Sequence, residues 1–459
     1  MRNFVLASML LLLPCQAWAM PVRVLMDVRS THSDGAHDMD TLVSMAEKRG
    51  IDVLIFGEHD RSSIRFGIAP MSRVLGYSME HPSLFTTGLA SFFTDLARVR
   101  GAYPGMTFMA ATESTPGYSW TGIPFRDLTL HNAERHIIAL GIERPEQVEA
   151  LPSYTLGHIH GPFKVSMAFW WILVGGVLIM LLRRRKRAVA LLLFAAFVAF
   201  LSTWLLKPKV DADADFIKAA QQQGLFVIWA HPGTLSGVRS GPMGVKLDTP
   251  PYSQRVFHDP TADGFAAVYG DTDTNTEPGG LWDQYMMNYM LGLHHAPIWG
   301  VAAGDFHKQG EAGEYLGNFP MDVWANKRTP AAILVAMRKG HMTAWGMPKG
   351  RNLRVKSLFL EDATGHRLLP GDEITTSGQV VLHCSLEERP VSAELVNNQF
   401  LHAQVIVDGH VLIQPLLGVD QPLLETLQLS PGAHVIRLRI PVQHGIRMEA
   451  NPFLLRVPG

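Results

Sequence analysis

Short apolar runs alternate with amphipathic stretches along much of the chain. Residues 40–49 have the apolar spacing of a helix and precede the continuous apolar run 53–56; similar runs recur at 225–229 and 299–303, before a helical stretch at 331–339. Alternation of the helical period with short buried strands is typical of βαβ units. This part of the chain therefore predicts an α/β fold with a parallel sheet or barrel.

The pattern changes after about residue 350. Apolar and polar residues alternate in short runs such as 353–360, 379–386 and 433–440, with Pro-Gly or Asp-Gly pairs between many of the runs. A period of two with turn residues between the runs is typical of antiparallel sheets packed face to face. We therefore expect an immunoglobulin-like β-sandwich over residues 350–459.

Two charge-free apolar stretches, 165–182 and 188–206, interrupt the first pattern. Each is about long enough to cross a bilayer as a helix, and the positive-inside rule places the five cations between them in the cytoplasm. Two buried core helices are the alternative, but such helices would not be joined by an arginine-rich tip. The sequence predicts a transmembrane hairpin over 165–206, flanked by the two parts, 20–164 and 207–349, of one exported domain.

The first residues predict export. An apolar run after Arg2 ends in Ala-Trp-Ala, the small-x-small pattern that signal peptidase cleaves, so residues 1–19 are expected to be a signal peptide. Cleavage would remove Cys15 and leave Cys384, which excludes a disulfide and favours a buried, inert thiol. These features predict a protein of the bacterial inner membrane with its folded domains in the periplasm. A formal net charge of -1 gives no reason to expect a nucleic-acid partner.

Residues that can bind metal ions follow several of the expected strands, where barrel-like α/β folds place their sites. Singly they are weak signals, because a histidine after a buried strand is more often structural than a ligand. The ordered set is more specific, and imidazole with carboxylate suits zinc, manganese or iron. The candidates, in chain order, are Asp34, His59, Glu113, His136, His231, Asp305 and His307.

The order of these motifs resembles the polymerase and histidinol phosphatase family, the PHP domain. Its members carry H-x-H-x-x-x-S-D-G, a D-H element, a lone Glu, a His before an apolar run, A-H-P and finally D-x-H. The resemblance covers most of residues 22–346, with 165–206 as an insertion. It implies a distorted (βα)7 barrel with two or three divalent ions, of manganese, zinc or iron, at its open end.

The resemblance also implies roles for the candidates. Carried over by position, all seven are metal ligands, Glu113 bridges two ions, and Glu113, Asp305 and His307 are catalytic. His131 is a less favoured substitute for His136, because only His136 directly precedes the apolar run.

The opening motif departs from the family pattern. Aligned without gaps on Ser-Asp-Gly at 33–35, the two family histidines fall on Asp27 and Arg29. Asp27 is expected to bind a metal, but Arg29 cannot, because guanidinium stays protonated. Two interpretations stay open: Arg29 supplies positive charge where an ion would lie and binds a phosphate, or the site has drifted toward a weak or inactive state. His32 is a less favoured replacement ligand.

Three arginines, Arg29, Arg61 and Arg239, are expected to hold an anionic substrate. The leading hypothesis is therefore a metal-dependent phosphoesterase that acts in the periplasm on a phosphorylated small molecule or envelope substrate, through a metal-activated water. One alternative is a catalytically weakened binding or assembly protein, whose C-terminal domain contacts an envelope protein. Another is a metal-dependent amidohydrolase, because similar barrels host that reaction.

Overall fold

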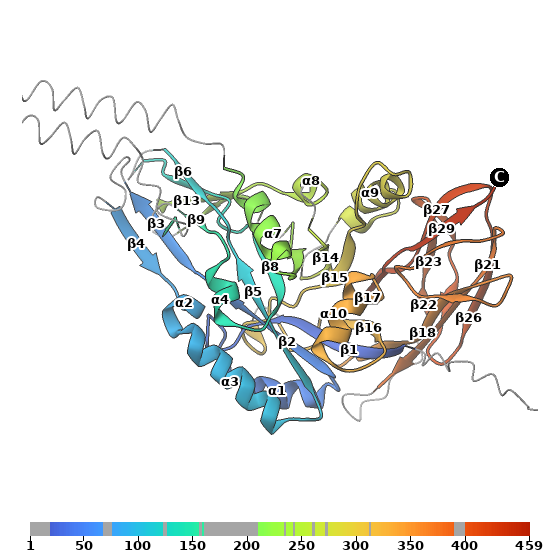
Figure 1. The fold of residues 1–459 in the computed structure, drawn as a ribbon, viewed down its shortest axis with the longest axis horizontal. Helices are drawn as coiled ribbons and strands as arrows, with labels where there is room; N and C mark the ends of the chain where they lie inside the picture. The colour runs from blue at the N-terminus through green and yellow to red at the C-terminus, as the bar shows by residue number, and fades with distance from the viewer. Residues whose placement is uncertain are drawn as a thin grey trace, which may run out of the picture.

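The computed structural model of the chain describes residues 19–67, 76–122, 126–155, 158–159, 210–233, 236–241, 244–258, 262–270, 274–311, 314–389 and 400–459. These residues are mainly in strands: 41% of the structure is strand and 21% is helix. Figure 1 shows a helix-flanked part formed by the N-terminal and middle segments, beside a C-terminal part built from strands.

One sheet of 15 strands runs through both parts of the molecule. Its strands in the first part are short and almost completely buried, as their continuous apolar sequences require. In sheet order, starting from one edge, they are β15 (Trp299–Ala302), β14 (Gly264–Val268), β11 (Phe226–Trp229), β8 (Ile137–Ile142), β5 (Thr107–Ser114), β2 (Val53–His59), β1 (Met20–Val28), β16 (Pro320–Ala325) and β17 (Met342–Gly346).

The first seven of these strands, β15 to β1, form a ring at one end. β1, β2 and β5 are parallel, β8 is antiparallel to both β5 and β11, and β14 and β15 run parallel to β11. The chain after β15 then returns to β1. The backbone N–H of Gly304 donates to the carbonyl of Met26 at 3.1 Å, and that of Phe306 donates to the carbonyl of Asp27 at 3.0 Å. The loop after β15 therefore lies against the end of β1.

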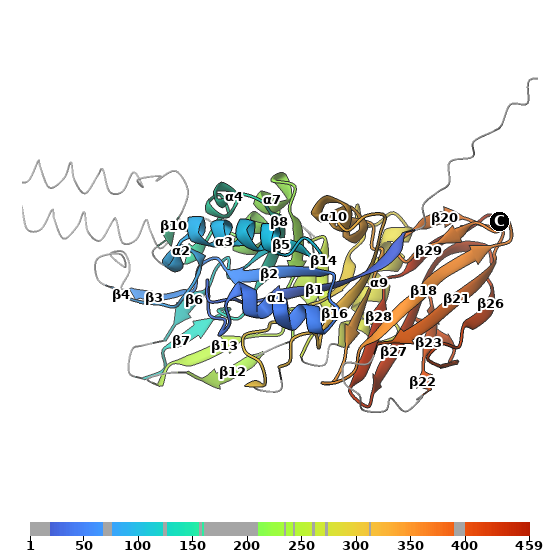
Figure 2. The same cartoon turned by 90° about the horizontal axis from the view of Figure 1, so that it is seen from below.

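Helices cover the outside of these strands. α1 (Met39–Lys48) begins where the Asp38 carboxylate accepts a hydrogen bond from the Thr41 N–H, and it packs Leu42 and Val43 inward. Figure 2 shows α3, α4 and α7 over one face of the strands. The helices of the described residues after α1 are α2 (Leu84–Thr87), α3 (Leu89–Ala102), α4 (Pro145–Glu149), α7 (Ala212–Gln222), α8 (Ser253–Val256), η2 (Thr274–Thr276), α9 (Leu281–Met290) and α10 (Pro330–Arg338).

Small sheets extend from the ring. One has four strands in the order β12 (Gly237–Ser240), β13 (Lys246–Thr249), β7 (Thr129–His131) and β6 (Ser119–Thr121). The others are the pairs β3 (Ser63–Gly67) with β4 (Gly76–Glu80) and β9 (Tyr154–Thr155) with β10 (His158–Ile159). Since β3 follows β2 after a short loop, the first pair continues directly from the end of the strand that carries His59.

The C-terminal part consists of two sheets around a separate apolar core. In β21 (Gln379–Glu388) every second residue from Val380 to Leu386 is buried, among them Leu382 and Cys384, and burial raises the pKa of the Cys384 thiol to about 12, as expected for an inert thiol. One sheet is β19 (Arg367–Leu368), β18 (Leu353–Asp362), β21 (Gln379–Glu388) and β26 (Leu423–Gln428). The other holds β28 (Ile446–Ala450), β27 (Gly432–Gln443), β23 (Gln404–Val407), β24 (His410–Ile413), β29 (Phe453–Val457) and β20 (Glu373–Thr375); β22 (Leu401–His402) pairs with β25 (Leu416–Leu417).

The second of these sheets is continuous with the sheet of the first part. β28 pairs antiparallel with β17, from Thr343 opposite Ala450 to Gly346 opposite Arg447. The side chain of Asn451 adds hydrogen bonds to both the N–H and the carbonyl of Gly300 in β15. The two parts therefore share backbone hydrogen bonds and do not meet through side chains alone.

The structure corrects the predicted fold class and location. In the part of the chain that it describes, no helix is long and apolar enough to cross a membrane. The longest of the described helices, α3, has 14 residues, whereas a span needs about 20. The transmembrane hairpin and the inner-membrane location are therefore not supported. The stretch 165–206 on which they were based lies outside the described residues, as do residues 1–18 of the expected signal peptide.

Candidate metal centre

Strand register places the first candidate ligands side by side. β2 ends at His59, which lies opposite Glu113 of β5, and Glu113 in turn lies opposite Ile138, close in sequence to His136. The apolar residues that precede His59 and Glu113 in their strands are buried in the core, so the position of each polar side chain is fixed by the strand before it. His231 follows β11 and Asp305 follows β15 at the same end of the ring.

The most accessible set of ligand atoms belongs to Asp34, His59 and His307, which we call the open group. Nε2 of His59 and Nε2 of His307 each lie 3.4 Å from Oδ2 of Asp34. The side chains of Asp34 and His307 are 34% and 31% exposed, so an ion held here would be open to water and substrate. One carboxylate and two imidazoles with an open side are the ligands of a catalytic rather than a structural metal site.

A second set, which we call the buried group, consists of Glu113, His136 and His231. Oε1 of Glu113 lies 3.1 Å from Nδ1 of His136 and 3.0 Å from Nε2 of His231, and the two imidazole nitrogens are 3.2 Å apart. Three ligand atoms that converge so closely surround a point where a small cation would be bound. Glu113 and His231 are buried, which protects this point from bulk water.

The third set, the arginine group, is formed by Asp27, Glu113 and Asp305. Nη2 of Arg29 contacts Oε2 of Glu113, lies 2.9 Å from Oδ1 of Asp305 and lies 3.7 Å from Oδ1 of Asp27. Asp34 is the fourth carboxylate around this guanidinium, with Oδ1 3.8 Å from Nε. The carboxylates that line this part of the centre therefore already share a cation of the chain itself.

The backbone around the arginine group is strained and closely packed. Asp27 and Asp305 have positive φ angles of 65° and 43°, a conformation that costs a non-glycine residue about 1–3 kcal/mol. Gly57 lies against Asp27, where a Cβ at position 57 would lie 2.7 Å from its Oδ1. Such a strained backbone persists where the surrounding structure holds it in place. Here the strained conformation directs the carboxylates of Asp27 and Asp305 toward Arg29.

The electrostatics of the centre favour added positive charge. Burial raises the pKa of Asp27 to about 7, against the opposing charge of Arg29. Burial acts in the same direction on Glu113, but Arg29 and His136 outweigh it and hold the pKa of that carboxyl well below its usual range. Burial opposes protonation of His231, yet its hydrogen bond with Glu113 and the charge of that residue raise its pKa to about 9.

The pKa of His307 is raised in the same way. Burial again opposes the shift, but hydrogen bonds to Asp34 and Glu314 raise the pKa of His307 to about 11. The centre therefore binds protons strongly at positions where a divalent ion would replace them. The chemistry of the donors fits such an ion, because imidazole and carboxylate together suit zinc, manganese or iron.

The structure brings together all the ligands expected from the sequence. Each of them belongs to at least one of the three groups, and Glu113 belongs to two. The residues are Asp27, Asp34, His59, Glu113, His136, His231, Asp305 and His307. The two less favoured substitutes lie elsewhere. His131 is within 3.1 Å of Asp248, and His32 is within 3.0 Å of Asp95.

The three arginines expected to bind substrate differ in position. Arg29 is fully buried inside the centre. Arg61 lines a cavity of about 290 Å³ that is also lined by Asp34, His59 and His136. Arg239 pairs with Glu134, another residue that lines this cavity.

Two carboxylates support the centre without having been predicted. Glu58, fully buried beside His59, accepts hydrogen bonds from the backbone and hydroxyl of Ser30 and from the hydroxyl of Ser33. A glutamate inside an otherwise apolar strand is a signal that could have identified it. Glu314 accepts a hydrogen bond from the backbone N–H of His307 at 2.9 Å, and no pattern in the sequence marks this residue.

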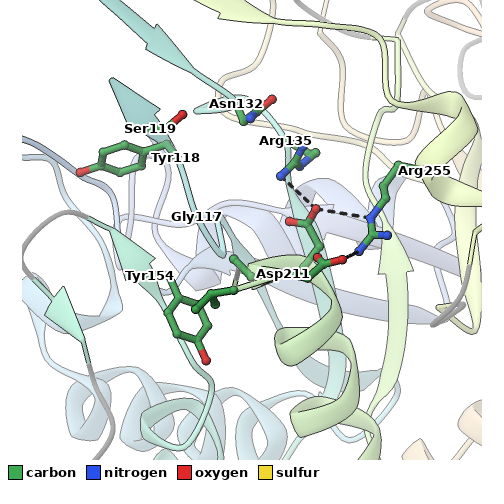
Figure 3. A pocket seen from close by; sticks show the side chains of 11 residues that line it. Gly117, Tyr118, Ser119, Asn132, Arg135, Tyr154, Asp211 and Arg255 are labelled. Carbon is green, nitrogen blue, oxygen red and sulfur yellow. Dashed lines mark hydrogen bonds and ion pairs between the residues drawn. The ribbon is translucent and has the colours of Figure 1, made fainter. Parts of the chain in front are cut away.

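A larger cavity, of about 620 Å³, lies near the centre but carries different chemistry (Figure 3). Its cations, Arg135 and Arg255, pair with Asp213 and Asp211 at the start of α7. Tyr118 lines this cavity and the smaller one beside Asp34, so the two adjoin each other. Among the described residues, the three groups of candidate metal ligands all lie outside its lining.

Comparison with models of protein families gives no match, and no curated protein matches. Among solved structures, the chain is similar to a two-domain protein from Bacteroides vulgatus that contains a predicted PHP-like metal-dependent phosphoesterase, at 12% identity and a TM-score of 0.40 over 96% of each chain. It is also similar to a predicted metal-dependent phosphoesterase from Bifidobacterium adolescentis, at 13% identity and a TM-score of 0.29 over 64% of this chain and 90% of that one.

An amidohydrolase from Chromobacterium violaceum, with bound sulfate and no metal, is similar at 15% identity and a TM-score of 0.28, over 64% of this chain and 90% of that one. All three TM-scores lie below 0.5 and establish no function for this chain.

Proposed function

We propose that the chain is a metal-dependent hydrolase of phosphoric esters. The observation that carries the proposal is the position of Glu113 between two sets of ligands. Its Oε1 faces His136 and His231, and its Oε2 lies 3.8 Å from Nδ1 of His59 in the open group. A carboxylate shared in this way can hold two divalent ions close together, the arrangement used for in-line attack on phosphorus.

When bound, such ions lower the pKa of a coordinated water and polarise a phosphoryl oxygen. The residues of the chain itself supply the ligands and the access. His136 and His231 hold Glu113 from one side. Asp34 and His59 lie at the wall of the cavity of about 290 Å³, through which a substrate reaches the open group. A cavity of this size favours a small phosphorylated molecule over a macromolecule.

Arg61 supports an anionic substrate. Its side chain is only 10% exposed, Nη1 lies 3.1 Å from Oδ2 of Asp60, and the guanidinium stacks 3.9 Å from the ring centroid of Phe85. Within the described residues, its Nε and Nη2 are buried without a hydrogen-bond partner. Two such N–H donors beside the open group suit a bidentate contact with a phosphate. A neutral amide could accept a hydrogen bond from these donors, but it has no anionic oxygens for a charge-assisted bidentate contact.

The test is metal-dependent hydrolysis by the purified full chain. We expect the wild-type protein to contain divalent metal by elemental analysis and to hydrolyse a chromogenic aryl phosphate with added Mn²⁺. Glu113→Gln should abolish both, whereas the control Glu47→Gln, at an exposed position on α1, should change neither. A panel that includes amides separates the two reaction types. Absence of bound metal together with absence of aryl phosphate hydrolysis would contradict the proposal.

A further inference from the structure

One of the three candidate metal groups already contains a cation. Nη2 of Arg29 contacts Glu113, lies 2.9 Å from Oδ1 of Asp305 and lies 3.7 Å from Oδ1 of Asp27. These three carboxylates are also spaced to hold a metal ion. A metal ion and the guanidinium nitrogen would therefore compete for the same oxygen atoms.

Arg29 is fixed in this position. Its side chain is fully buried, Nη1 donates to the carbonyl of Gly57 at 2.5 Å, and its backbone N–H donates to the carbonyl of Phe306 at 2.9 Å. Guanidinium also stays charged at every pH at which proteins fold. The arginine is therefore a permanent cation that cannot leave its site without a rearrangement of β1 and the loop after β15.

Burial bears on one part of the first interpretation that the sequence left open for Arg29, the contact with a phosphate. The cavity beside Asp34 and His59 is lined by other residues, and Arg29 is not among them. A fully buried guanidinium whose nitrogens face Glu113, Asp305 and Gly57 is not available to bind a phosphate of the substrate.

We propose that Arg29 takes the place of a metal ion. Divalent ions then bind only at the open group and the buried group, and the arginine group is closed by the chain's own cation. The inference rests on the proposed metal centre and adds the number of ions that the centre binds. Arg29 acts as a positioning residue: it donates to one lone pair of Oε2 of Glu113, which leaves the other lone pair for an ion of the open group, and Oε1 stays directed at His136 and His231 without a third ion.

The number of bound ions tests this assignment. We expect purified wild-type chain, saturated with Mn²⁺ or Zn²⁺ and desalted, to retain about two ions per chain by elemental analysis. Arg29→His replaces the cation with a ligand that faces three carboxylates, and it should retain about one ion more. Arg29→Lys keeps the positive charge and should retain the wild-type number.

A matched control is Arg98→His. Arg98 also pairs with two aspartates, Asp40 at 2.7 Å and Asp95 at 3.2 Å, but it is 47% exposed on the surface. This variant should bind no additional ion. Circular dichroism and thermal unfolding confirm that each variant is folded.

The outcomes separate this inference from the proposed function. A folded Arg29→His variant with the wild-type number of ions, or a wild-type chain that binds a third ion, would overturn the inference and leave the hydrolase proposal standing. A wild-type chain without metal, beside an Arg29→His variant that binds an ion, would overturn the hydrolase proposal and support the inference. If Arg29→His does not fold, Arg29→Gln supplies the same test: removal of the cation should let an ion enter the arginine group.

Discussion

Arg29 and Arg437 are both completely buried among carboxylates, and their surroundings differ. Arg29 lies inside the metal centre. Arg437 lies where β27 meets α9, with Nε 2.6 Å from Oδ1 of Asp283 and Nη1 3.2 Å from Oε2 of Glu449, and it stacks over the ring of Trp282. We call its surroundings the seam cluster; its charged members are Arg437, Arg439, Arg447, Asp283, Glu277 and Glu449.

The two surroundings differ in charge balance. In the seam cluster three guanidinium groups face three carboxylates, so every buried charge has a counterpart. In the metal centre one guanidinium faces four carboxylates, and the further positive charge comes from exchangeable protons on His231 and His307, whose pKa values are raised to about 9 and about 11. A balanced cluster is complete and ties two segments of the chain together, whereas an unbalanced one retains affinity for further cations. The same residue type therefore closes the structure in one place and, under the proposed function, completes a binding site in another.

The largest effect is expected at the seam. Arg437→Met leaves Asp283 and Glu449 buried with less compensating charge and should lower the free energy of unfolding by about 3–5 kcal/mol. Urea unfolding followed by tryptophan fluorescence measures this loss of unfolding free energy. The folded variant should keep the wild-type metal content. A loss below about 1 kcal/mol would show that the seam cluster does not stabilise the fold.

The next largest effect is expected at the shared ligand. Mutation of a residue that only orients a metal ligand costs about 10–100-fold in metal affinity, so Glu113→Gln should cost more than about 100-fold. Competition with a fluorescent chelator measures the affinity. Glu449→Gln, the matching change at the seam, should leave metal affinity unchanged. Equal losses in both variants would mean that the two clusters do not differ in function.

Removal of the metal should destabilise the chain by a smaller amount at each site. At a free ion concentration of about 100 times Kd, bound metal stabilises the folded state by about 2.7 kcal/mol per site. Unfolding with and without a chelator should therefore differ, and the difference should persist in Arg437→Met. No effect of the chelator on unfolding of the metal-loaded chain would contradict a centre that binds cations only when folded.

The last comparison concerns pH. The pKa of His231 is raised to about 9 and that of His307 to about 11, from an ordinary value of 6.5. The metal-free chain therefore gains stability from these protons below about pH 6.5 and loses it as the pH rises through 9 and 11. Metal must displace the same protons, so its affinity should rise up to about tenfold per pH unit for each proton released. Calorimetry in buffers of different ionisation enthalpy counts the protons released on metal binding. Binding without proton release would contradict the raised pKa values of His231 and His307.

The candidate ligands were predictable because each depends on local sequence. His59 and Glu113 follow apolar runs that form buried strands, and the ends of neighbouring strands meet. The environment of Arg29 was not predictable, since its carboxylates come from β1, β5 and the loop after β15, and their convergence depends on how the ring closes. Glu314 was missed for the same reason.

Other features of the fold show the same limit. Alternating residues after position 350 indicate strands, but they do not say that β28 continues the sheet of the first part by pairing with β17. The membrane prediction for 165–206 relied on length and apolarity, which say nothing about how a segment packs. The finding that overturns the anchor is that no helix within the described ranges can span a bilayer.

The pairing of β17 with β28 has a consequence for how the chain can be divided. A protein cut after residue 349 would leave unpaired those backbone N–H and carbonyl groups of Thr343 to Gly346 that face β28, along an exposed edge of β17. Such edges join to one another and promote aggregation. The pairing with β28 therefore covers this edge, and a fragment that ends at residue 349 should aggregate more readily than the full chain.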